Sequence, residues 1–235
     1  MSADRRLRQW SQDRYASLIK PLVLTSLLLT FVLLFLWLAG EVQEGDTQRI
    51  DVLLTRSALQ LRERWPFLVE SVRDISGLGG AVVLTILTVC CAGYLVLVQR
   101  TSTGVVVGIS VATGALVLGG IKHLVGRSRP DAHLAAGVFD GLSFPSGHAS
   151  MAAVVYLTVG TLVASTRPQF VERAYILAAA ALVSVLIDVS RLALGAHWAT
   201  DVLGGWLFGS TWAALWLLLL RHVARRTTGR APSSV

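Results

Sequence analysis

Long apolar runs separated by short polar connectors dominate the pattern of this chain. Six runs are long enough to cross a hydrocarbon core of about 30 Å as α-helices, which takes about 20 predominantly apolar residues. They cover residues 21–39, 78–98, 104–121, 149–165, 174–194 and 198–220. The pattern therefore predicts an all-α, polytopic membrane protein built as a bundle of six transmembrane helices.

A shorter periodic segment lies between the first two runs. Its apolar residues recur every three or four positions before Pro66, and they are Ile50, Leu53, Leu54, Ala58, Leu61 and Trp65. The spacing predicts an amphipathic helix over residues 50–65, on the extracytoplasmic side. Such a helix either lies on the membrane surface or packs on the protein itself, and the sequence is compatible with both.

Two pairs of glycines have the GxxxG spacing that lets neighbouring helices approach closely. They are Gly104 with Gly108 and Gly205 with Gly209. We interpret both pairs as helix-packing sites without a role in chemistry.

Composition agrees with a membrane protein. Of the 235 residues, 54% are hydrophobic and only 15% are charged, whereas soluble domains are about 25% charged. The net charge of +7 does not indicate a nucleic-acid partner, because the basic residues gather at the chain ends and in short connectors. No linker divides the chain, so we expect a single integral membrane domain over residues 1–235.

The distribution of lysine and arginine predicts the orientation in the membrane. With both termini in the cytoplasm, twelve of the 21 basic residues fall on that side. They are Arg5, Arg6, Arg8, Arg14, Lys20, Arg100, Arg167, Arg173, Arg221, Arg225, Arg226 and Arg230. Residues 1–20 and 221–235 then form a cytoplasmic N-terminus and tail. The first run exceeds a signal-peptide core of about 7–15 residues, so we expect an uncleaved span.

Three short polar clusters lie next to apolar runs within residues 122–201, and this orientation places all three on the extracytoplasmic side. The first cluster contains Lys122, Arg129 and Pro130. Lys122 and Arg129 are two helical turns apart, so they share a face if the third span continues to Pro130. Such a pair is either a phosphate clamp or two snorkelling side chains at a helix end.

The second cluster, Pro145-Ser146-Gly147-His148, runs directly into the fourth span. Ser146 suits the N-cap position, and Gly147 lets a ligand approach the backbone. A helix start of this kind binds anions through its free N–H groups and its dipole, and His148 is placed to donate a proton to a leaving oxygen. The alternative is an ordinary turn followed by an interfacial histidine.

The third cluster joins Ser190 and Arg191 to His197 and Asp201. His197 and Asp201 are four residues apart, so on one helix they share a face, and the carboxylate can fix the tautomer of the ring. The second ring nitrogen is then free to act as a nucleophile. Ionisable groups at the centre of a membrane helix cost about 2.5–3.5 kcal/mol each, which disfavours a pair without a function.

In this order, Lys-x6-Arg-Pro, Pro-Ser-Gly-His and Ser-Arg-x5-His-x3-Asp resemble the signature of the type 2 phosphatidic acid phosphatase superfamily. The resemblance implies a membrane phosphatase in which His197 attacks phosphorus to form a phosphohistidine, Asp201 orients His197, and His148 protonates the leaving group. It also implies the residues that bind the phosphate oxygens, which are Lys122, Arg129, Ser146, Gly147 and Arg191. Because so many cations surround the anion, we expect neither a metal nor another cofactor.

The resemblance further implies a lipid phosphate or diphosphate as substrate, with its tail in the bilayer. Undecaprenyl pyrophosphate, phosphatidylglycerophosphate and phosphatidic acid are the candidates. A lipid phosphotransferase, which passes the phosphoryl group to a lipid acceptor, fits the same residues. A transporter with cations along an anion path also fits in part, but such a path needs no histidine pair with an orienting carboxylate. The sequence leaves the oligomeric state open.

Overall fold

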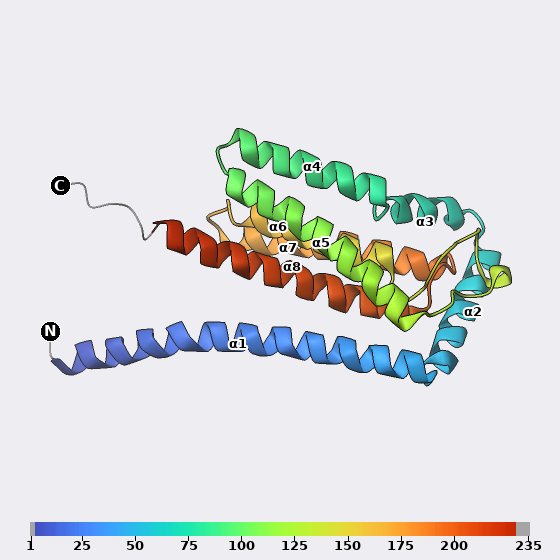
Figure 1. Cartoon of the computed structure of the whole chain (residues 1–235), viewed down its shortest axis with the longest axis horizontal. Coiled ribbons are helices and arrows are strands. Elements are labelled where there is room, and N and C mark those ends of the chain that lie inside the picture. Colours follow the sequence, from blue (N-terminus) through green and yellow to red (C-terminus); the bar gives the residue numbers. More distant parts are fainter. Residues whose placement is uncertain (1–2, 229–235) are drawn as a thin grey trace.

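The computed structural model describes the backbone of residues 3–228 and the side chains of residues 22–221. All regular structure within this range is helical (Figure 1). The α-helices are α1 (Ala3–Glu44), α2 (Gln48–Arg64), α3 (Leu68–Gly77), α4 (Ala81–Leu97), α5 (Thr101–Val125), α6 (Gly147–Ala164), α7 (Phe170–Ala193) and α8 (Ala199–Thr228). A short 3₁₀ turn, η1 (Ala132–Leu134), lies in the loop between α5 and α6. The predicted all-α class is confirmed.

Five of these helices are long and apolar enough to cross a membrane. Their apolar portions are Leu22–Glu44, Thr101–Val125, Gly147–Ala164, Phe170–Ala193 and Ala199–Arg221. A sixth span results if α3 and α4, which meet at a bend of 42°, are counted as one broken span. A multi-pass membrane protein is therefore confirmed, and the count of six depends on this bent pair. The side chains of the expected cytoplasmic ends, residues 1–20 and 222–235, lie outside the described range.

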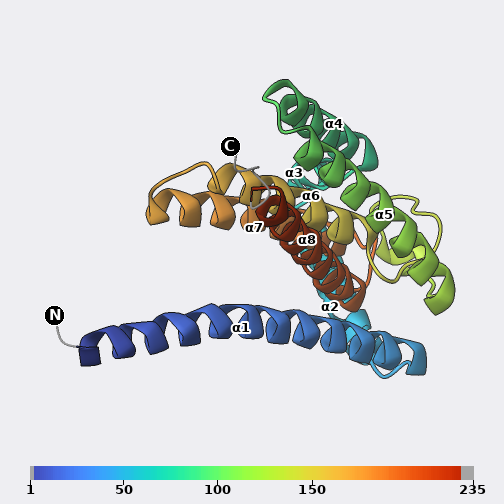
Figure 2. The same cartoon turned by 60° about the vertical axis from the view of Figure 1, so that its left-hand side comes forward.

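Helix α6 lies at the centre of the bundle. It packs against α7 and α8 along most of its length, and α4 and α5 pair with one another beside it. Half of the α6 span is buried inside the protein, against 6% of the α1 span. Helix α1 contacts α8 near its C-terminal end and diverges from the bundle toward its N-terminal end (Figure 2). The central helix is therefore also the one that begins with the predicted anion-binding turn.

Small residues bring α6 and α8 close together. A Cβ atom added to Gly205 would lie 2.7 Å from Ala149 Cβ, and one added to Gly209 would lie 2.7 Å from Ala153 Cβ. Real Cβ atoms essentially never come within 3.0 Å of other atoms, so only glycine allows this approach. The prediction that this GxxxG pair is a packing site is confirmed.

The second GxxxG pair behaves differently at its two positions. Gly104 of α5 faces the backbone of α4, where an added Cβ would lie 2.8 Å from the carbonyl oxygen of Ala92. At Gly108 an added Cβ would meet nothing within 4 Å. The predicted packing role is therefore right for Gly104 and wrong for Gly108, because α5 turns that residue away from its neighbours.

Helix α2 has the predicted amphipathic character, and two of its polar residues face the rest of the protein. Asp51 and Thr55 are fully buried against the rest of the protein. Ile50, Leu53 and Leu61 are 60%, 65% and 54% exposed. Of the two alternatives left open by the sequence, packing on the protein itself is therefore present, through contacts with α7 and α8.

Candidate active site

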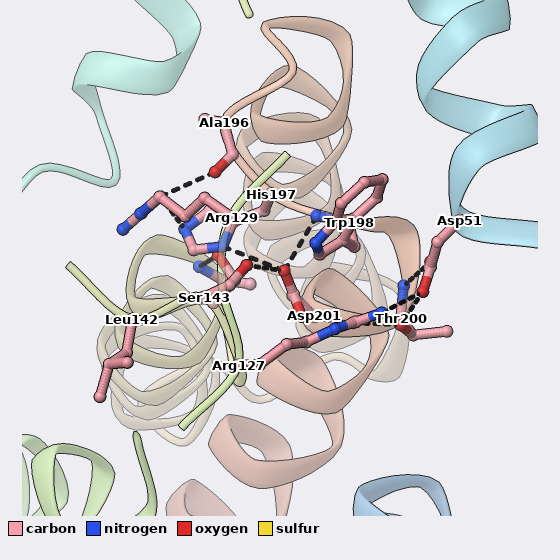
Figure 3. A network of polar contacts seen from close by, with 12 residues as sticks. Asp51, Arg127, Arg129, Leu142, Ser143, Ala196, His197, Trp198, Thr200 and Asp201 are labelled. Carbon is pink, nitrogen blue, oxygen red and sulfur yellow. Dashed lines mark hydrogen bonds and ion pairs between the residues drawn. The ribbon is translucent and has the colours of Figure 1, made fainter. Parts of the chain in front are cut away.

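The three sequence clusters meet at one end of the bundle, where α5 and α7 end and α6 and α8 begin (Figures 1 and 3). The backbone N–H of Ser146 donates to the carbonyl of Asp201 at 2.9 Å, which joins the starts of α6 and α8. Arg129 Nη1 lies 3.1 Å from Nε2 of His197, which joins the first cluster to the third. The prediction that these clusters form one site is therefore supported by direct contacts.

Helix α5 ends at Val125, so Lys122 and Arg129 do not share a helix face, and that expectation was wrong. Gly126 adopts the left-handed conformation, with φ of 66°, and its N–H donates to the carbonyl of Lys122. This is the usual glycine end of a helix, and it comes four residues before Pro130. The chain then turns, and Arg129 reaches the site from the loop.

Lys122 and Arg129 are held mainly by backbone carbonyls. Lys122 Nζ donates to the carbonyl oxygens of Leu142 at 2.9 Å and Ser143 at 3.3 Å. Arg129 Nη1 donates to the carbonyl of Ala196 at 2.7 Å, and its Nε donates to the loop carbonyls of Asp140 and Gly141. Carbonyl partners orient a cation without cancelling its charge, so both groups remain able to attract an anion.

His197 lies before α8, in the turn that follows α7, so the expectation that it shares a helix face with Asp201 was wrong. The pairing itself is present, because Nδ1 of His197 lies 3.5 Å from Oδ2 of Asp201. Gly195 makes the turn possible with its φ of 66°, since any side chain there would meet the backbone of Leu134 and Ala135. The turn brings the ring back over the first residues of α8.

The surroundings of His197 define its protonation state. Its side chain is 1% exposed, and burial lowers its pKa to about 4 although Asp201 opposes this shift, so the ring is neutral at pH 7. Arginine carries only donors, so Nε2 must accept from Arg129, and the ring proton is therefore assigned to Nδ1, facing Asp201. This is the tautomer that leaves a lone pair on Nε2.

Asp201 is fully buried, and both of its carboxylate oxygens accept hydrogen bonds (Figure 3). Its Oδ2 accepts from the hydroxyl of Ser143 and from the backbone N–H of Trp198 at 2.9 Å. Its Oδ1 accepts from Arg127 at 2.7 Å. A buried carboxylate held in this way stays charged and fixed in orientation.

The second cluster forms the predicted helix start. Ser146 is the N-cap of α6, and its side chain accepts from the N–H of Ala149 at 3.5 Å, which confirms the predicted cap. A Cβ added to Gly147 would lie 3.9 Å from Cε of Lys122, so this backbone and the lysine lie next to each other. His148, in the first turn, is close enough to the charges of Arg191 and Lys122 to interact with them.

Arg191 approaches the same region from the last turn of α7. It is 7% exposed, its Nη1 donates to Oγ of Ser76 at 2.8 Å, and its guanidinium carbon lies 5.0 Å from the ring centre of Phe139. Its Nε has no hydrogen-bond partner within the described range. A buried arginine with an unused donor is a natural ligand for an anion oxygen.

Arg127 and Asp51, which the sequence did not indicate, complete the network around Asp201. Arg127 donates through Nη2 to Oδ2 of Asp51 at 2.6 Å as well as to Asp201. Thr200 joins them, because its hydroxyl accepts from Arg127 and donates to Asp51. Asp51 is one of several charged residues on an amphipathic helix, and nothing in the sequence relates it to residue 127.

Taken together, the site presents three cations, two histidines and the N-terminus of α6 at the edge of the apolar bundle. No group of three or more His, Cys, Asp or Glu side chains suited to a metal ion occurs among the residues described. The arrangement can bind a dianion and offer a neutral imidazole to it, which are the requirements of phosphoryl transfer.

The site lies within a region that matches a known protein family. The sequence profile of the PAP2 superfamily matches residues 103–225, more than half of the chain and all three clusters. The chain therefore belongs to the PAP2 superfamily, and it is a membrane phosphatase of that superfamily.

Two matches to proteins of Bacillus subtilis carry names that state a substrate. Phosphatidylglycerophosphatase B of strain 168 is 32% identical over 181 residues, which cover 75% of this chain and 86% of that protein. The crystal structure of a transmembrane PAP2 type phosphatidylglycerolphosphate phosphatase from Bacillus subtilis matches with a TM-score of 0.77. The match covers 83% of this chain and 96% of that one, with 28% identity.

Proposed function

We propose that this phosphatase removes a phosphate from a membrane lipid through a phosphohistidine on His197, with phosphatidylglycerophosphate as its first candidate substrate. The observation that carries the proposal is the state of His197. Its Nδ1–H faces Asp201 and its Nε2 lone pair points to Arg129, in a region with two further cations. A neutral imidazole fixed in this tautomer is an activated nucleophile.

In the first step, Nε2 of His197 attacks phosphorus and the P–O bond to the lipid alcohol breaks. The ring keeps its proton on Nδ1, where the Asp201 carboxylate stabilises the positive charge that develops on the imidazole. Arg129 now donates to Nε2, so it must exchange this hydrogen bond for a phosphate oxygen when the substrate binds. The same movement would leave the nucleophile free.

His148 supplies the proton that the leaving lipid alkoxide takes up. Its place in the first turn of α6 puts it beside the phosphate cradle and across from His197. In the second step neutral His148 accepts a proton from water while the water oxygen attacks phosphorus. The P–N bond then breaks, and inorganic phosphate leaves with His197 neutral again.

The phosphate oxygens would be held by Lys122, Arg129 and Arg191, together with Ser146 and the backbone of Gly147. Positioning and charge stabilisation supply most of the rate acceleration in phosphoryl transfer. Three cations and a helix N-terminus provide both without a metal ion, so we propose a metal-independent reaction.

Membrane geometry supports a lipid substrate. The site lies at one end of the spans, so a phosphate headgroup would reach it while the acyl chains stay among the helices. The basic residues at the opposite ends of the spans favour a site on the extracytoplasmic face, in a six-span topology with α3 and α4 as one broken span.

The name of the relatives in Bacillus subtilis favours phosphatidylglycerophosphate over the other two candidates. Undecaprenyl pyrophosphate and phosphatidic acid present the same terminal phosphate, so they are the appropriate comparators. Transfer of the phosphoryl group to a lipid acceptor uses the same first step and differs only in the second nucleophile.

The test is phosphate release from each of the three lipids in detergent micelles with EDTA present. We expect release by the purified wild type, no release by His197→Ala, and ³²P on the wild-type protein but not on His197→Ala after rapid acid-free quenching with labelled substrate. Arg56→Ala, on the exposed side of α2, is the control for substitution itself.

Each other outcome contradicts a stated part of the proposal. Activity in His197→Ala would exclude this residue as the nucleophile, and activity that EDTA abolishes and Mg²⁺ restores would contradict the metal-independent reaction. Labelled phospholipid without free phosphate would indicate transfer to an acceptor. The ranking of the three rates decides the substrate.

A further inference from the structure

We propose that Arg127 and Asp51 form a positioning pair that holds the Asp201 carboxylate in the orientation required by His197; this inference rests on the proposed role of His197. One guanidinium bridges two fully buried carboxylates. The Nη1 of Arg127 lies 2.7 Å from Oδ1 of Asp201, and its Nη2 lies 2.6 Å from Oδ2 of Asp51.

Arg127 differs from the other cations of the site in its partners. Lys122 and Arg129 are bound mainly by carbonyl oxygens and keep their positive charge for a substrate. Arg127 faces two carboxylates, which cancel its charge and occupy both of its terminal nitrogens. It is therefore not a phosphate ligand, although it lies only two residues from Arg129.

Asp51 holds both Arg127 and the start of α8. Its Oδ1 accepts from the backbone N–H of Thr200 at 3.0 Å, and its Oδ2 accepts from the hydroxyl of Thr200 at 2.6 Å. A carboxylate at a helix N-terminus is favourable because it satisfies a free N–H and complements the helix dipole. Thus α2 contributes an acid that fixes the first turn of α8, where Asp201 lies.

The two oxygens of Asp201 have different partners, and this difference gives Arg127 its role. Within the described range Arg127 is the hydrogen-bond donor to Oδ1, while Oδ2 accepts from Ser143 and from the N–H of Trp198 and lies 3.5 Å from Nδ1 of His197. Without Arg127 the carboxylate loses the hydrogen bond that the described structure gives Oδ1, and it can rotate away from His197. The tautomer and the direction of Nε2 would then no longer be fixed.

This pair makes α2 part of the active site. Asp51 and Arg127 are far apart in the sequence, and Asp51 is buried although most of the other polar side chains of α2 are exposed. Through Asp51, α2 therefore contributes to the geometry of the active site as well as to packing.

The first experiment is chemical rescue of Arg127→Ala. The side chain of Arg127 borders a cavity of about 150 Å³, lined also by Val42, Gly45, Gln48, Asp51, Ser128 and Trp198, through which a small cation can enter. We assay p-nitrophenyl phosphate, so that the result does not depend on which lipid is the substrate. We expect kcat to fall by about 10- to 100-fold with KM nearly unchanged, and guanidinium in the low millimolar range to restore part of kcat.

The second experiment uses Asp51→Asn, which keeps the shape of the side chain. We expect kcat to fall less than in Arg127→Ala, Asp51→Glu to recover part of it, and the double variant Asp51→Asn/Arg127→Ala to be no slower than Arg127→Ala alone. Non-additivity is expected because both residues act through Asp201. Arg56→Ala, on the same helix, is the matched control, and thermal unfolding in detergent reports on folding.

Three results would overturn the inference: wild-type kcat in Arg127→Ala, a raised KM in place of a lowered kcat, or additive effects in the double variant. A folded Arg127→Ala protein that guanidinium does not restore would also count against it. Wild-type hydrolysis of p-nitrophenyl phosphate without hydrolysis of any lipid would refute the proposed substrate class while leaving the comparison of variants valid.

Discussion

Replacing Gly209 by alanine tests whether close packing of α6 and α8 holds the site together. An added Cβ would be closest to the carbonyl oxygen of Ser150, and it would lie 2.7 Å from Ala153 Cβ. Ordinary contact begins at 3.4 Å, so the Ala153 contact alone would require α8 to move away from α6 by about 0.7 Å, and the closer Ser150 oxygen would require more. Asp201 lies two turns earlier on α8, and Ser146 donates to its carbonyl, so the shift would reach the site.

The size of the effect follows from two opposing contributions. Overpacking of a tight interface costs about 1–3 kcal/mol. Alanine in place of glycine within a helix gains about 1 kcal/mol. Gly108→Ala isolates the second contribution, because its added Cβ meets nothing within 4 Å. We therefore expect Gly209→Ala to be less stable than Gly108→Ala by about 1–3 kcal/mol.

The assay is equilibrium unfolding in mixed dodecylmaltoside–SDS micelles, followed by tryptophan fluorescence. The activity of both variants is measured in dodecylmaltoside alone. We expect Gly108→Ala to keep wild-type activity and Gly209→Ala to lose several-fold in kcat. Equal stability of the two variants would refute the argument that the α6–α8 contact depends on glycine.

Three further predictions concern the site itself. Because burial lowers the pKa of His197 to about 4, the ring stays neutral as the pH falls through 6.5, its ordinary value. With p-nitrophenyl phosphate, whose leaving phenolate needs no proton from His148, kcat/KM is corrected for the substrate's own titration. Between pH 7.5 and 5.5 we expect it to change by less than about twofold, whereas an ordinary imidazole at position 197 would lose about tenfold. Arg129→Lys keeps the charge but loses the fork that reaches His197, so kcat should fall by about 10- to 100-fold in steady-state hydrolysis; unchanged kcat would show that charge alone suffices. Gly195→Ala should cost at least about 1–2 kcal/mol, because it adds contact with the Leu134 backbone to the cost of a left-handed residue. Gly141→Ala, left-handed but in open space, is its control in the same unfolding assay, and equal losses would exclude the contact.

Hydropathy predicted the helical bundle because each span is a long uninterrupted signal. Ser146 was also predictable as a helix cap, since the Pro-Ser-Gly sequence precedes an apolar run and the cap depends on local hydrogen bonds. The early end of α5 had a readable signal in Gly126, but the expectation of a continuous helix gave more weight to Pro130. Local chemistry was therefore the most predictable part of the site.

Contacts between distant segments were not predictable from one sequence. Arg127 resembles any loop cation, and its role appears only when α2 places Asp51 beside it. The turn at Gly195 likewise removes His197 from α8, although the spacing of four residues from Asp201 suggested one helix face. In both cases the backbone path, set by packing between helices, decided the geometry.

The partners of the basic residues show how the site handles charge at the edge of a bilayer. Carbonyl oxygens hold Lys122 and Arg129, and a hydroxyl and an aromatic ring hold Arg191, so none of the three is neutralised by direct ion pairing. Among the described cations of the site, Arg127 is the one paired with carboxylates. A phosphate dianion therefore enters a cradle that still has net positive charge, while the carboxylate that orients His197 is kept ionised by a separate cation. If Arg129 or Arg191 were paired with acids instead, substrate binding would first have to break an ion pair, and much of the electrostatic gain from the phosphate would be lost.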